Sequence, residues 1–497
     1  MSSDDARLDI VRFLYRSEVR ELAGLEPSLS VLHWLREDEG SMGTKEGCNQ
    51  GDCGACTVVL AELRGDDVHL HTANSCLMPV AMLHGRALFT IEDVAVKGVL
   101  HPIQEAMVEH GGSQCGFCTP GFVMSLWCTG ETSRLEGTTL TREAVADSIS
   151  GNLCRCTGYR PILDAAMSAV SEPTQPASSI DASRLRTVLQ ELDAPGTLRI
   201  AAGAAAFVAP DNEGALAQEL HANPAAHVIS GGTDLALSLR ATGADHHDDL
   251  VLMSTDRIAS LHRIEVTGGQ VSIGAAVSVE DAWRALVERA PHLERMHRRF
   301  GSPAIRSVGT VGGNIANASP VADLTPVLIA VDAAVILMRS EGSRTVPVAE
   351  FATGVRSTVL QPGEFLARIT IPLRGFSRDV RAYKVSRRFD DDISSVSASF
   401  ALEMDGATIT DVRVVYGGMA TTVRRASRTE AALRGREWDE TALAAAQASL
   451  ADEFTPISDH RASAQYRERA AGGLLHRWWL ETGLDAPSVP VDIWARS

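Results

Sequence analysis

The segment at residues 48–56 reads Cys-Asn-Gln-Gly-Asp-Cys-Gly-Ala-Cys, and a further cysteine, Cys76, follows it after twenty residues. This C-x4-C-x2-C…C spacing is the plant-type arrangement that holds a [2Fe–2S] cluster. Gly51 and Gly54 leave room for backbone N–H groups to approach the sulfur atoms of such a cluster. Zinc sites more often use two C-x2-C pairs, so zinc fits this spacing poorly. We therefore expect an iron–sulfur cluster on Cys48, Cys53, Cys56 and Cys76.

A second set of cysteines consists of two close pairs, Cys115-Gly-Phe-Cys118 and Cys154-Arg-Cys156, each beside a segment with helical periodicity. Turns at two helix ends can bring four thiolates together, and the helix dipoles favour the negative charge of a cluster. The ligand types alone also admit zinc, although the neighbouring ferredoxin-like segment favours a second [2Fe–2S] cluster. Cys128 stands alone in an apolar helical segment, so we expect a buried side chain without a ligand role.

The cysteines are confined to one part of an acidic chain. All nine lie between Cys48 and Cys156, which indicates that this part has a dedicated use for sulfur. The chain has 63 acidic and 46 basic residues, a formal charge of −17, which argues against a nucleic-acid partner. It has no run of 18 apolar residues and no signal-peptide layout at its start. We expect a cytoplasmic protein without a membrane anchor, where disulfides are rare.

The hydrophobic periodicity predicts a multidomain α+β protein. Strand patterns occur first, at residues 8–15, 57–63 and 68–72. Helical patterns follow at residues 101–110, 121–128, 141–150 and 162–170. The stretch SEPTQPASSIDAS at 171–183 is rich in serine and proline and predicts an interdomain linker. Further on, strand patterns occur at 396–403 and 408–416 and helical patterns at 439–451 and 462–481. The domain boundaries that we expect are 1–90, 91–172, a linker at 173–196, 197–377 and 378–497.

Two glycine-rich loops stand out in the middle of the chain. The first is Val228-Ile-Ser-Gly-Gly-Thr-Asp-Leu235, an apolar strand that runs into a Gly-Gly turn, and the second is Thr310-Val-Gly-Gly-Asn-Ile-Ala-Asn-Ala-Ser319. Backbone N–H groups in such turns can bind phosphate, although a purely structural turn explains either loop alone. Two such loops in one domain favour a pyrophosphate site. No G-x-G-x-x-G follows a strand, so a Rossmann site is not supported.

Three strings in the cysteine-containing part, EGCNQGDCGACTV, QCGFCTPGFVMS and GNLCRCTGYRPI, occur in that order. Together they resemble the iron–sulfur half of the molybdenum hydroxylases, the family of xanthine dehydrogenase and aldehyde oxidase. The resemblance implies a β-grasp ferredoxin-like domain at 1–90 and a four-helix domain at 91–172, each with one [2Fe–2S] cluster. It also implies that the helical cluster is nearer to the molybdenum, and that Gln114 lies close to molybdopterin.

The strings ISGGTDLAL, FGSPAIRSVGTVGGNIANASPVADLTP and KVSRRFDDDISSV resemble the FAD domain of the same family. This implies an α+β FAD-binding domain of the vanillyl-alcohol-oxidase type at 197–377, and an α+β C-terminal flavoprotein domain of the CO-dehydrogenase type at 378–497. The residues implied to contact FAD are Val228, Ile229, Ser230, Gly231, Gly232, Thr233, Asp234, Leu235, Phe300, Gly301, Thr310, Gly313, Asn314, Asp323, Leu366 and Lys384.

One loop departs from the family pattern. Members that reduce NAD often carry F-F-x-G-Y-R-x-T beside the flavin, whereas this chain reads Phe351-Ala-Thr-Gly-Val355-Arg-Ser-Thr358. An aromatic ring at the position of Val355 could stack on a nicotinamide, and a valine cannot. The resemblance still implies NAD as the electron acceptor.

No segment after the flavin region is long enough for a molybdenum domain, so we expect molybdopterin on a large partner subunit, within a dimer of two-chain units. This division resembles the small subunit of bacterial two-subunit xanthine dehydrogenases, which act in purine catabolism. The resemblance implies that the partner hydroxylates xanthine or hypoxanthine. Electrons would then pass through the second cluster, the first cluster and FAD to NAD⁺. No catalytic triad or carboxylate pair is evident, so we expect no catalytic residue of this chain's own.

Three alternatives stay open at this point. The chain can be the equivalent subunit of a hydroxylase for aldehydes or N-heterocycles with another electron acceptor. It can be a non-enzymatic module that binds zinc and a nucleotide. It can also be an electron carrier without a fixed partner.

Overall fold

The computed structural model describes residues 7–171, 179–241 and 249–487. The chain forms two compact units. The first comprises residues 1–259 with 301–310, and the second comprises residues 260–300 with 311–497. The division falls within the range 197–377, for which the sequence predicts one FAD-binding domain. We therefore describe the two units separately.

The first sheet of the first unit has the β-grasp arrangement that the sequence predicts. Its strand order is β3 (Glu18–Leu22), β2 (Val11–Tyr15), β6 (Ala87–Phe89), β4 (Thr57–Arg64) and β5 (Asp67–Asn74). Of the hydrogen-bonded strand pairs in this sheet, β2 and β6 run parallel and the others run antiparallel. Helix α1 (Val31–His33) and the π-helical turn Trp34–Asp38 cover one face. The Trp34 ring contacts Phe13 and Tyr15 of β2 at centroid distances of 5.2 and 5.5 Å.

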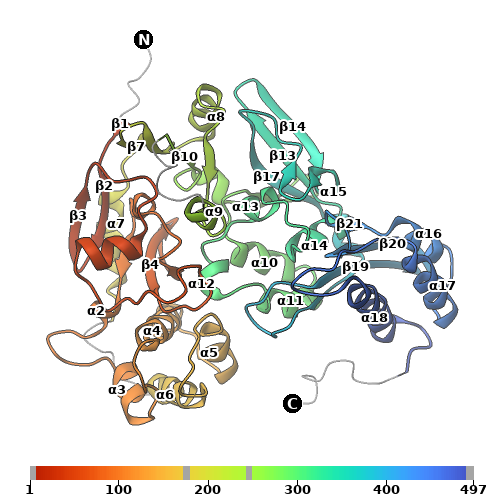
Figure 1. The fold of residues 1–497 in the computed structure, drawn as a ribbon, viewed down its shortest axis with the longest axis horizontal. Coiled ribbons are helices and arrows are strands. Elements are labelled where there is room, and N and C mark those ends of the chain that lie inside the picture. The colour runs from red at the N-terminus through yellow and green to blue at the C-terminus, as the bar shows by residue number, and fades with distance from the viewer. Residues whose placement is uncertain (1–6, 172–178, 242–248, 488–497) are drawn as a thin grey trace. The chain divides into compact units, whose positions relative to one another are not determined.

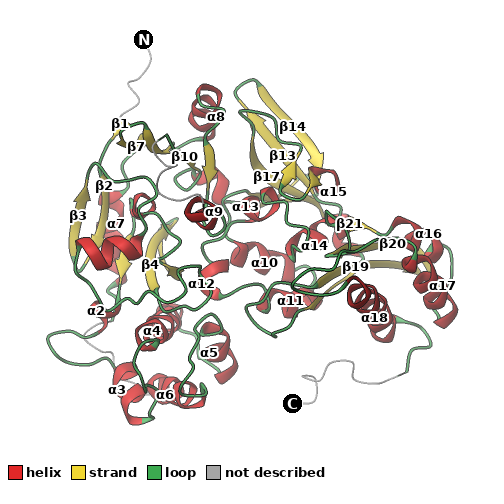
Figure 2. Ribbon diagram, in the orientation of Figure 1, coloured by secondary structure: helices red, strands yellow, loops and turns green. Residues whose placement is uncertain are grey.

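The predicted helical domain is also present, and Figure 2 shows it as a cluster of helices without strands. Its members are α3 (Pro102–Glu109), α4 (Thr119–Glu136), α5 (Arg142–Ser148) and α6 (Arg160–Ser171), preceded by the short α2 (Ile91–Val94). The side chain of Thr141 accepts a hydrogen bond from the Ala144 amide and caps α5. Helix α4 is buried along most of its length, and Cys128 is 6% exposed within this core, as predicted.

The linker predicted at 173–196 differs from the structure over part of its length. Residues 172–178 lie outside the described residues, but 182–192 form helix α7, which Asp181 caps. Leu185, Leu189 and Leu192 of α7 are buried in the same core as the helical domain. Their i, i+4, i+7 spacing is helical, and the Ser/Pro-rich stretch before them masked that signal.

The second sheet of the first unit has the order β1 (Arg7–Leu8), β7 (Thr197–Ala202), β8 (Ala205–Ala209), β10 (Val251–Ser254) and β9 (His227–Ile229). The strand predicted at 8–15 is therefore divided, because β1 pairs with β7 while β2 joins the β-grasp sheet. Helices α8 (Glu213–Ala222), α9 (Leu235–Ala241) and α12 (Pro303–Arg306) complete this part of the unit (Figure 1).

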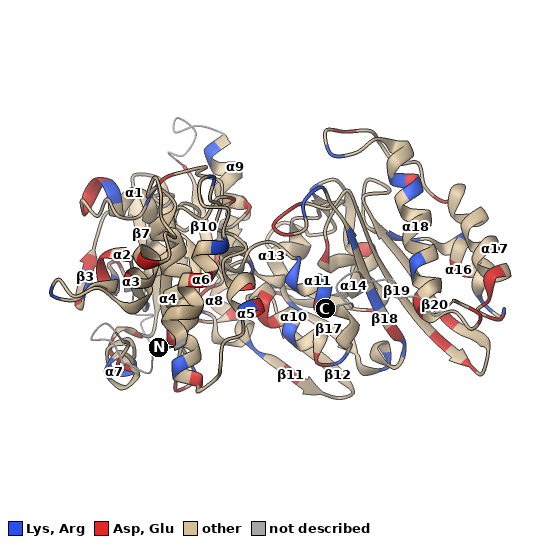
Figure 3. Cartoon of the chain, turned by 90° about the horizontal axis from the view of Figure 1, so that it is seen from below, with Lys and Arg blue, Asp and Glu red and all other residues tan. Residues whose placement is uncertain are grey.

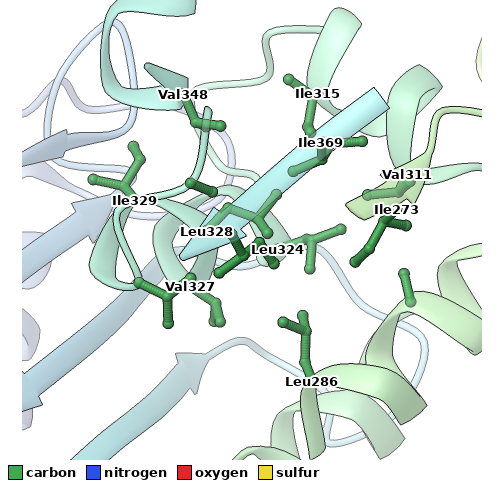
Figure 4. Packing of buried hydrophobic residues seen from close by; sticks show 14 of the residues in the cluster. Ile273, Leu286, Val311, Ile315, Leu324, Val327, Leu328, Ile329, Val348 and Ile369 are labelled. Carbon is green, nitrogen blue, oxygen red and sulfur yellow. The ribbon is translucent and has the colours of Figure 1, made fainter. Parts of the chain in front are cut away.

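The second unit begins with a five-stranded antiparallel sheet in the order β11 (Ile264–Thr267), β12 (Gln270–Gly274), β17 (Phe365–Pro372), β13 (Ala334–Arg339) and β14 (Gly342–Pro347). Its helices are α10 (Val279–Val287), α11 (Glu294–Arg298), α13 (Val311–Ala316), α14 (Leu324–Ala330) and α15 (Val348–Phe351). Figure 4 shows how Ile369 of β17, Leu286 of α10 and the apolar face of α14 meet in one core. A short hairpin, β15 (Ala352–Gly354) and β16 (Ser357–Thr358), follows α15.

The end of the second unit is a sheet in the order β18 (Asp379–Val385), β19 (Val396–Asp405), β20 (Thr408–Gly417) and β21 (Arg424–Arg425). Helices α16 (Ser427–Leu433), α17 (Glu440–Ala451) and α18 (Ala464–Thr482) pack on it. The strands and helices predicted for this region are confirmed to within a few residues. Across the described ranges, no helix combines the length and apolarity that a membrane crossing needs.

Candidate iron–sulfur and flavin sites

The first cysteine loop is wound so that backbone amides converge on its sulfur atoms. The amides of Gln50, Asp52 and Cys53 donate to Sγ of Cys48 at 3.3–3.4 Å, and the Cys48 amide donates to Sγ of Cys53 at 3.2 Å. The loop makes this turn with positive φ at Asn49 (54°), Gly51 (82°) and Gly54 (64°), a conformation that glycine adopts without steric cost. N–H donors aimed at thiolate sulfur help to tune the potential of a bound cluster.

The four predicted ligands of the first group lie together as two pairs. The thiol of Cys48 is a neighbour of that of Cys53 and acts on its pKa, and the thiols of Cys56 and Cys76 act on each other's pKa in the same way. The two pairs are close enough for Cys53 to act electrostatically on Cys56. Each iron of a [2Fe–2S] cluster takes two cysteine thiolates when four cysteines hold it. Two adjoining pairs therefore fit that group.

The second group has the same organisation. Cys118 is the residue before α4, and Cys154 and Cys156 precede α6, so two helix starts bring the loops together. The thiol of Cys118 pairs with that of Cys154, and the thiol of Cys115 with that of Cys156. The hydroxyl of Thr157 donates to Sγ of Cys154 at 3.1 Å. These four residues also fit a two-iron cluster.

The pairing of the thiols in the two cysteine groups bears on the zinc alternative. Tetrahedral zinc needs all four ligands around one centre, whereas a two-iron cluster separates them into two pairs. The pairing in both groups therefore favours iron–sulfur clusters over the zinc alternative.

The two cysteine loops contact each other through the backbone. The amide of Leu153 donates to the carbonyl of Cys53 at 3.0 Å, which links the residue before Cys154 to a residue of the first group. The buried side chain of Asn152 donates to the Gly54 carbonyl at 3.0 Å and accepts from the Ser125 hydroxyl at 2.7 Å. One residue thus ties the first cysteine loop to helix α4 and to the second loop.

The predicted flavin turn lies beside the first cysteine group. Strand β9 ends at Ile229, and the Ser230 hydroxyl accepts from that of Thr255 at 2.8 Å. A Cβ on Gly231 would stand 2.0 Å from the Val308 carbonyl oxygen, and Gly232 has a φ of 71°. Only glycines permit so close an approach of two backbone segments. The turn is therefore a backbone-lined surface of the kind that can bind a phosphate.

Helix α9 leads from this turn to the first cysteine group. Ala236 and Leu237 of α9 pack against the cluster of buried residues that contains Cys56 and Cys76. At the end of the helix, the Arg240 side chain donates to the backbone carbonyl of Asn49 and, at 2.9 Å, to its Oδ1. Its guanidinium also lowers the pKa of the Cys76 thiol, after the larger effect of the hydrogen bond with Cys56.

The predicted flavin residues are divided between the two units. Residues 228–235, Gly301 and Thr310 belong to the first, and Phe300, Gly313, Asn314, Asp323, Leu366 and Lys384 belong to the second. In the second unit, the Lys384 ammonium forms a buried ion pair with Asp323 at 2.6 Å, and Asp323 also accepts from Ser394 at 2.6 Å. The structure therefore brings Asp323 and Lys384 together.

Two further residues of the second unit bear on a bound flavin. The Oδ1 atom of Asn314 in α13 is buried and has no hydrogen-bond partner among the described residues. A buried amide oxygen of this kind is costly unless it is satisfied, and a ligand N–H or hydroxyl would satisfy it. By contrast, Leu366 is 7% exposed and is part of the core of this unit, which leaves little of its side chain for a cofactor.

Sequence reasoning missed Arg240 and Asn152. Arg240 reaches Asn49 across 191 residues of sequence, and Asn152 reaches Gly54 across 98. Neither residue stands in a motif whose spacing would reveal the contact. The position of Asn152, two residues before Cys154, is the one signal that could have drawn attention to it. Gln114, which the resemblance places near molybdopterin, is exposed.

Four protein-family models match consecutive segments of the chain. They are a 2Fe-2S iron-sulfur cluster binding domain at residues 20–81, a [2Fe-2S] binding domain at 90–167, an FAD binding domain in molybdopterin dehydrogenase at 202–374, and a CO dehydrogenase flavoprotein C-terminal domain at 381–482. The fold and the sites thus define a protein with two [2Fe–2S]-binding domains and an FAD-binding domain.

The chain resembles longer curated relatives over most of its length. It is 31% identical to xanthine dehydrogenase/oxidase of Gallus gallus, over 90% of this chain and 38% of the relative. It is 29% identical to aldehyde oxidase 4 of Cavia porcellus, over 92% of this chain and 38% of the relative. The chain therefore spans about two fifths of the length of these relatives.

Solved structures give the same classification. Quinoline 2-oxidoreductase from Pseudomonas putida 86 aligns with a TM-score of 0.51 and 26% identity, over 56% of this chain and 96% of that chain. Carbon monoxide dehydrogenase from Hydrogenophaga pseudoflava aligns with a TM-score of 0.51 and 28% identity, over 58% of this chain and 97% of that chain. The chain corresponds to the iron–sulfur and FAD portion of the molybdenum hydroxylase family.

Proposed function

We propose that the chain is the electron-transfer subunit of a xanthine dehydrogenase-type oxidoreductase. A molybdenum centre on a partner subunit delivers electrons, and this chain passes them to NAD⁺. The clusters carry single electrons, and FAD converts these into the two-electron transfer that NAD⁺ needs. The protein's own residues hold the cofactors in place and tune their potentials, and none of them reacts with the substrate.

The observation that carries this proposal is the order in which the cofactor sites of the first unit contact one another. The second cysteine group meets the first through the hydrogen bond from Leu153 to Cys53. The first group in turn meets the flavin turn, where a Cβ on Gly232 would lie 3.5 Å from the carbonyl oxygen of Leu77, the residue after Cys76. The order of contact supports a path from the second group to the first group and on to the flavin.

The surface around the second cysteine group supports a partner at that end of the path. Cys115 and Cys156 are exposed, and the neighbouring Phe117 and Leu153 are 49% and 43% exposed. Exposed apolar side chains beside a redox site are typical of a docking surface. We propose that the large molybdenum-binding subunit covers it, in a cytoplasmic assembly of two two-chain units.

The proposed substrate class is xanthine and hypoxanthine, by way of the partner. Its support is the 31% identity to a xanthine dehydrogenase/oxidase. An equivalent subunit for aldehydes or N-heterocycles is the second candidate, because an aldehyde oxidase and a quinoline oxidoreductase match at 29% and 26% identity. Activity of the copurified partner on xanthine, an aldehyde and quinoline distinguishes the candidates.

The acceptor is tested by anaerobic reduction of the holoprotein with NADH, followed by visible absorbance and EPR. Flavin bleaching and the EPR signals of two reduced clusters are expected. A flavin and clusters that stay oxidised under excess NADH would refute NAD as the acceptor. Val355, which is 57% exposed in the turn between β15 and β16, would then be the first residue to replace with tyrosine. A colourless protein without four irons per chain would refute the whole proposal.

A further inference from the structure

A cavity of about 320 Å³ lies in the second unit among α11, the segment before it, β18 and α18. Its lining is rich in basic side chains and consists of His292, Arg295, Met296, Arg299, Arg381, Ala382, Tyr383, Lys384, Leu474, Arg477 and Glu481. Apart from Lys384, which is also predicted to contact FAD, its lining residues are not among the predicted cofactor ligands. Its volume is at the low end of the range for small-molecule sites.

The charge of this lining contrasts with that of the whole protein. Four arginines line the cavity against a single carboxylate, Glu481, in a chain whose formal charge is −17. Figure 3 shows basic residues on α11, β18 and α18. Lys384 does not add to this excess, because its ammonium is already paired with Asp323.

Glu481 holds two of the arginines in fixed positions. Its carboxylate accepts hydrogen bonds from Nε of Arg477 at 2.8 Å, from Arg381 at 3.1 Å and from the Tyr383 hydroxyl at 2.7 Å. Arg381 also pairs with Asp379 at 3.0 Å. Although burial acts to raise the pKa of Glu481, hydrogen bonds from Arg477 and Tyr383 lower it below the usual value. The carboxylate therefore stays charged and orders its donors.

Arg477 keeps hydrogen-bonding capacity after this pairing. Its Nε donates to Glu481, while its two terminal nitrogens have no hydrogen-bond partner among the described residues. The guanidinium lies 5.3 Å from the centre of the Tyr383 ring, which further fixes its plane. Burial is the main cause that lowers the pKa of Arg299; Arg295 and Arg477 lower it further, while Asp323 and Asp390 oppose them, so three guanidinium groups lie near one another in this cavity.

We propose that this cavity binds a small anion that carries a phosphate group. A guanidinium with free parallel N–H donors matches phosphate oxygens in geometry and charge. The prior ordering of Arg477 and Arg381 by Glu481 reduces the entropy lost on binding. Met296, Ala382 and Leu474 supply an apolar wall for the body of a phosphate ester.

The test is isothermal titration calorimetry of the holoprotein in phosphate-free buffer, with inorganic phosphate in one arm and phenyl phosphate in the other. Saturable binding is expected in at least one arm. Tighter binding of phenyl phosphate identifies an ester site, and equal affinities identify a site for the phosphate group alone. No saturable binding of either probe up to about 10 mM, where less than 3 kcal/mol of affinity would remain, overturns the proposal.

Two charge-matched variants locate the site. Arg477→Gln is expected to weaken binding at least tenfold, as the loss of a charged hydrogen bond implies. Arg469→Gln removes the same charge from an exposed position on the same helix, outside the cavity lining, and is expected to change affinity less than twofold. Equal losses in the two variants would reveal only general charge attraction and would overturn the assignment. Retained flavin and cluster absorbance shows that each variant is folded, and Arg295→Gln provides a second cavity variant.

Discussion

The contact between α4 and the first cysteine loop allows a sharp test, because it depends on the absence of one side chain. Gly121 stands in the first turns of α4, and a Cβ at this position would lie 2.2 Å from the Gly54 carbonyl oxygen and 3.2 Å from Nδ2 of Asn152. Both neighbours belong to the contact between the cysteine loops. The carbonyl is backbone and cannot rotate away, so Gly121→Ala must push the helix and the loop apart by about 1 Å to reach an ordinary contact distance.

The same helix contains a control. A Cβ on Gly130 of α4 would have no atom within 4 Å. Alanine is favoured over glycine in a helix by about 1 kcal/mol, so Gly130→Ala is expected to stabilise the protein by about 0.5–1 kcal/mol. Gly121→Ala gains the same propensity but adds overpacking, which costs about 1–3 kcal/mol or more. We expect a net loss of about 1–2 kcal/mol, so the two variants should shift in opposite directions.

The assay is urea unfolding of each holoprotein, followed by the absorbance of the clusters, together with EPR of the reduced protein. Gly121→Ala should lower the unfolding midpoint and alter the spin coupling between the two clusters, because it moves the loop that holds Cys53 and Cys56. Gly130→Ala should leave the EPR spectrum unchanged. If Gly121→Ala is as stable as Gly130→Ala and has a wild-type spectrum, the close contact between the loops is refuted.

Three further outcomes follow from single contacts. Arg240→Gln removes a cation beside Cys76 and is expected to make the reduction potential of that cluster more negative, which an EPR-monitored redox titration measures. Lys384→Met leaves Asp323 buried without its ion-pair partner and is expected to cost about 3–5 kcal/mol and to weaken flavin retention, measured by FAD released on gel filtration. Burial lowers the pKa of His71 to about 4 from 6.5, so the folded state resists protonation that the unfolded state accepts. The free energy of unfolding therefore decreases as pH falls from 6.5 towards 4, by up to about 3 kcal/mol. His71→Gln should reduce this decrease, which urea unfolding between pH 7 and pH 5 measures.

The local elements and the first cysteine loop could be predicted from the sequence because their signals are short-range, whereas the assignment of the second cysteine group depends also on the neighbouring ferredoxin-like segment and the family resemblance. The C-x4-C-x2-C spacing is contained within nine residues, and a helical pattern depends on apolar residues only three or four positions apart. Most helices with regular apolar spacing are predicted to within a few residues, but the helix predicted at 121–128 extends over 119–136, because its polar second half lacks an apolar pattern. The linker at 173–196 is a second exception, because its Ser/Pro-rich composition conceals the leucine periodicity of α7.

The long-range arrangement could not be predicted, because no local pattern encodes it. The strand pattern at 8–15 gives no sign that Leu8 pairs with Leu198 while Val11 pairs with Leu22. The insertion of 301–310 into the first unit is equally hidden. The same holds for Arg240, whose contact with Asn49 depends on where α9 ends relative to the cysteine loop. Such contacts arise from tertiary packing alone.

The glycines of the cysteine and flavin loops have a common physical role in this arrangement. A Cβ on Gly54 would lie 2.4 Å from the Gly151 carbonyl oxygen, one on Gly121 would lie 2.2 Å from that of Gly54, and one on Gly231 would lie 2.0 Å from that of Val308. Each contact is therefore backbone against backbone, with no side chain between the segments. Electron transfer slows steeply with distance, so removing a layer of side chains at the Gly54 and Gly121 contacts lets the two cysteine groups lie closer than ordinary packing would. Local turn geometry explains why a glycine with positive φ stands at position 54. Gly121 is within a helix, where the backbone conformation does not require glycine. Its presence is explained by the approach of the two cysteine loops, which makes it the residue where the proposed electron path is most open to test.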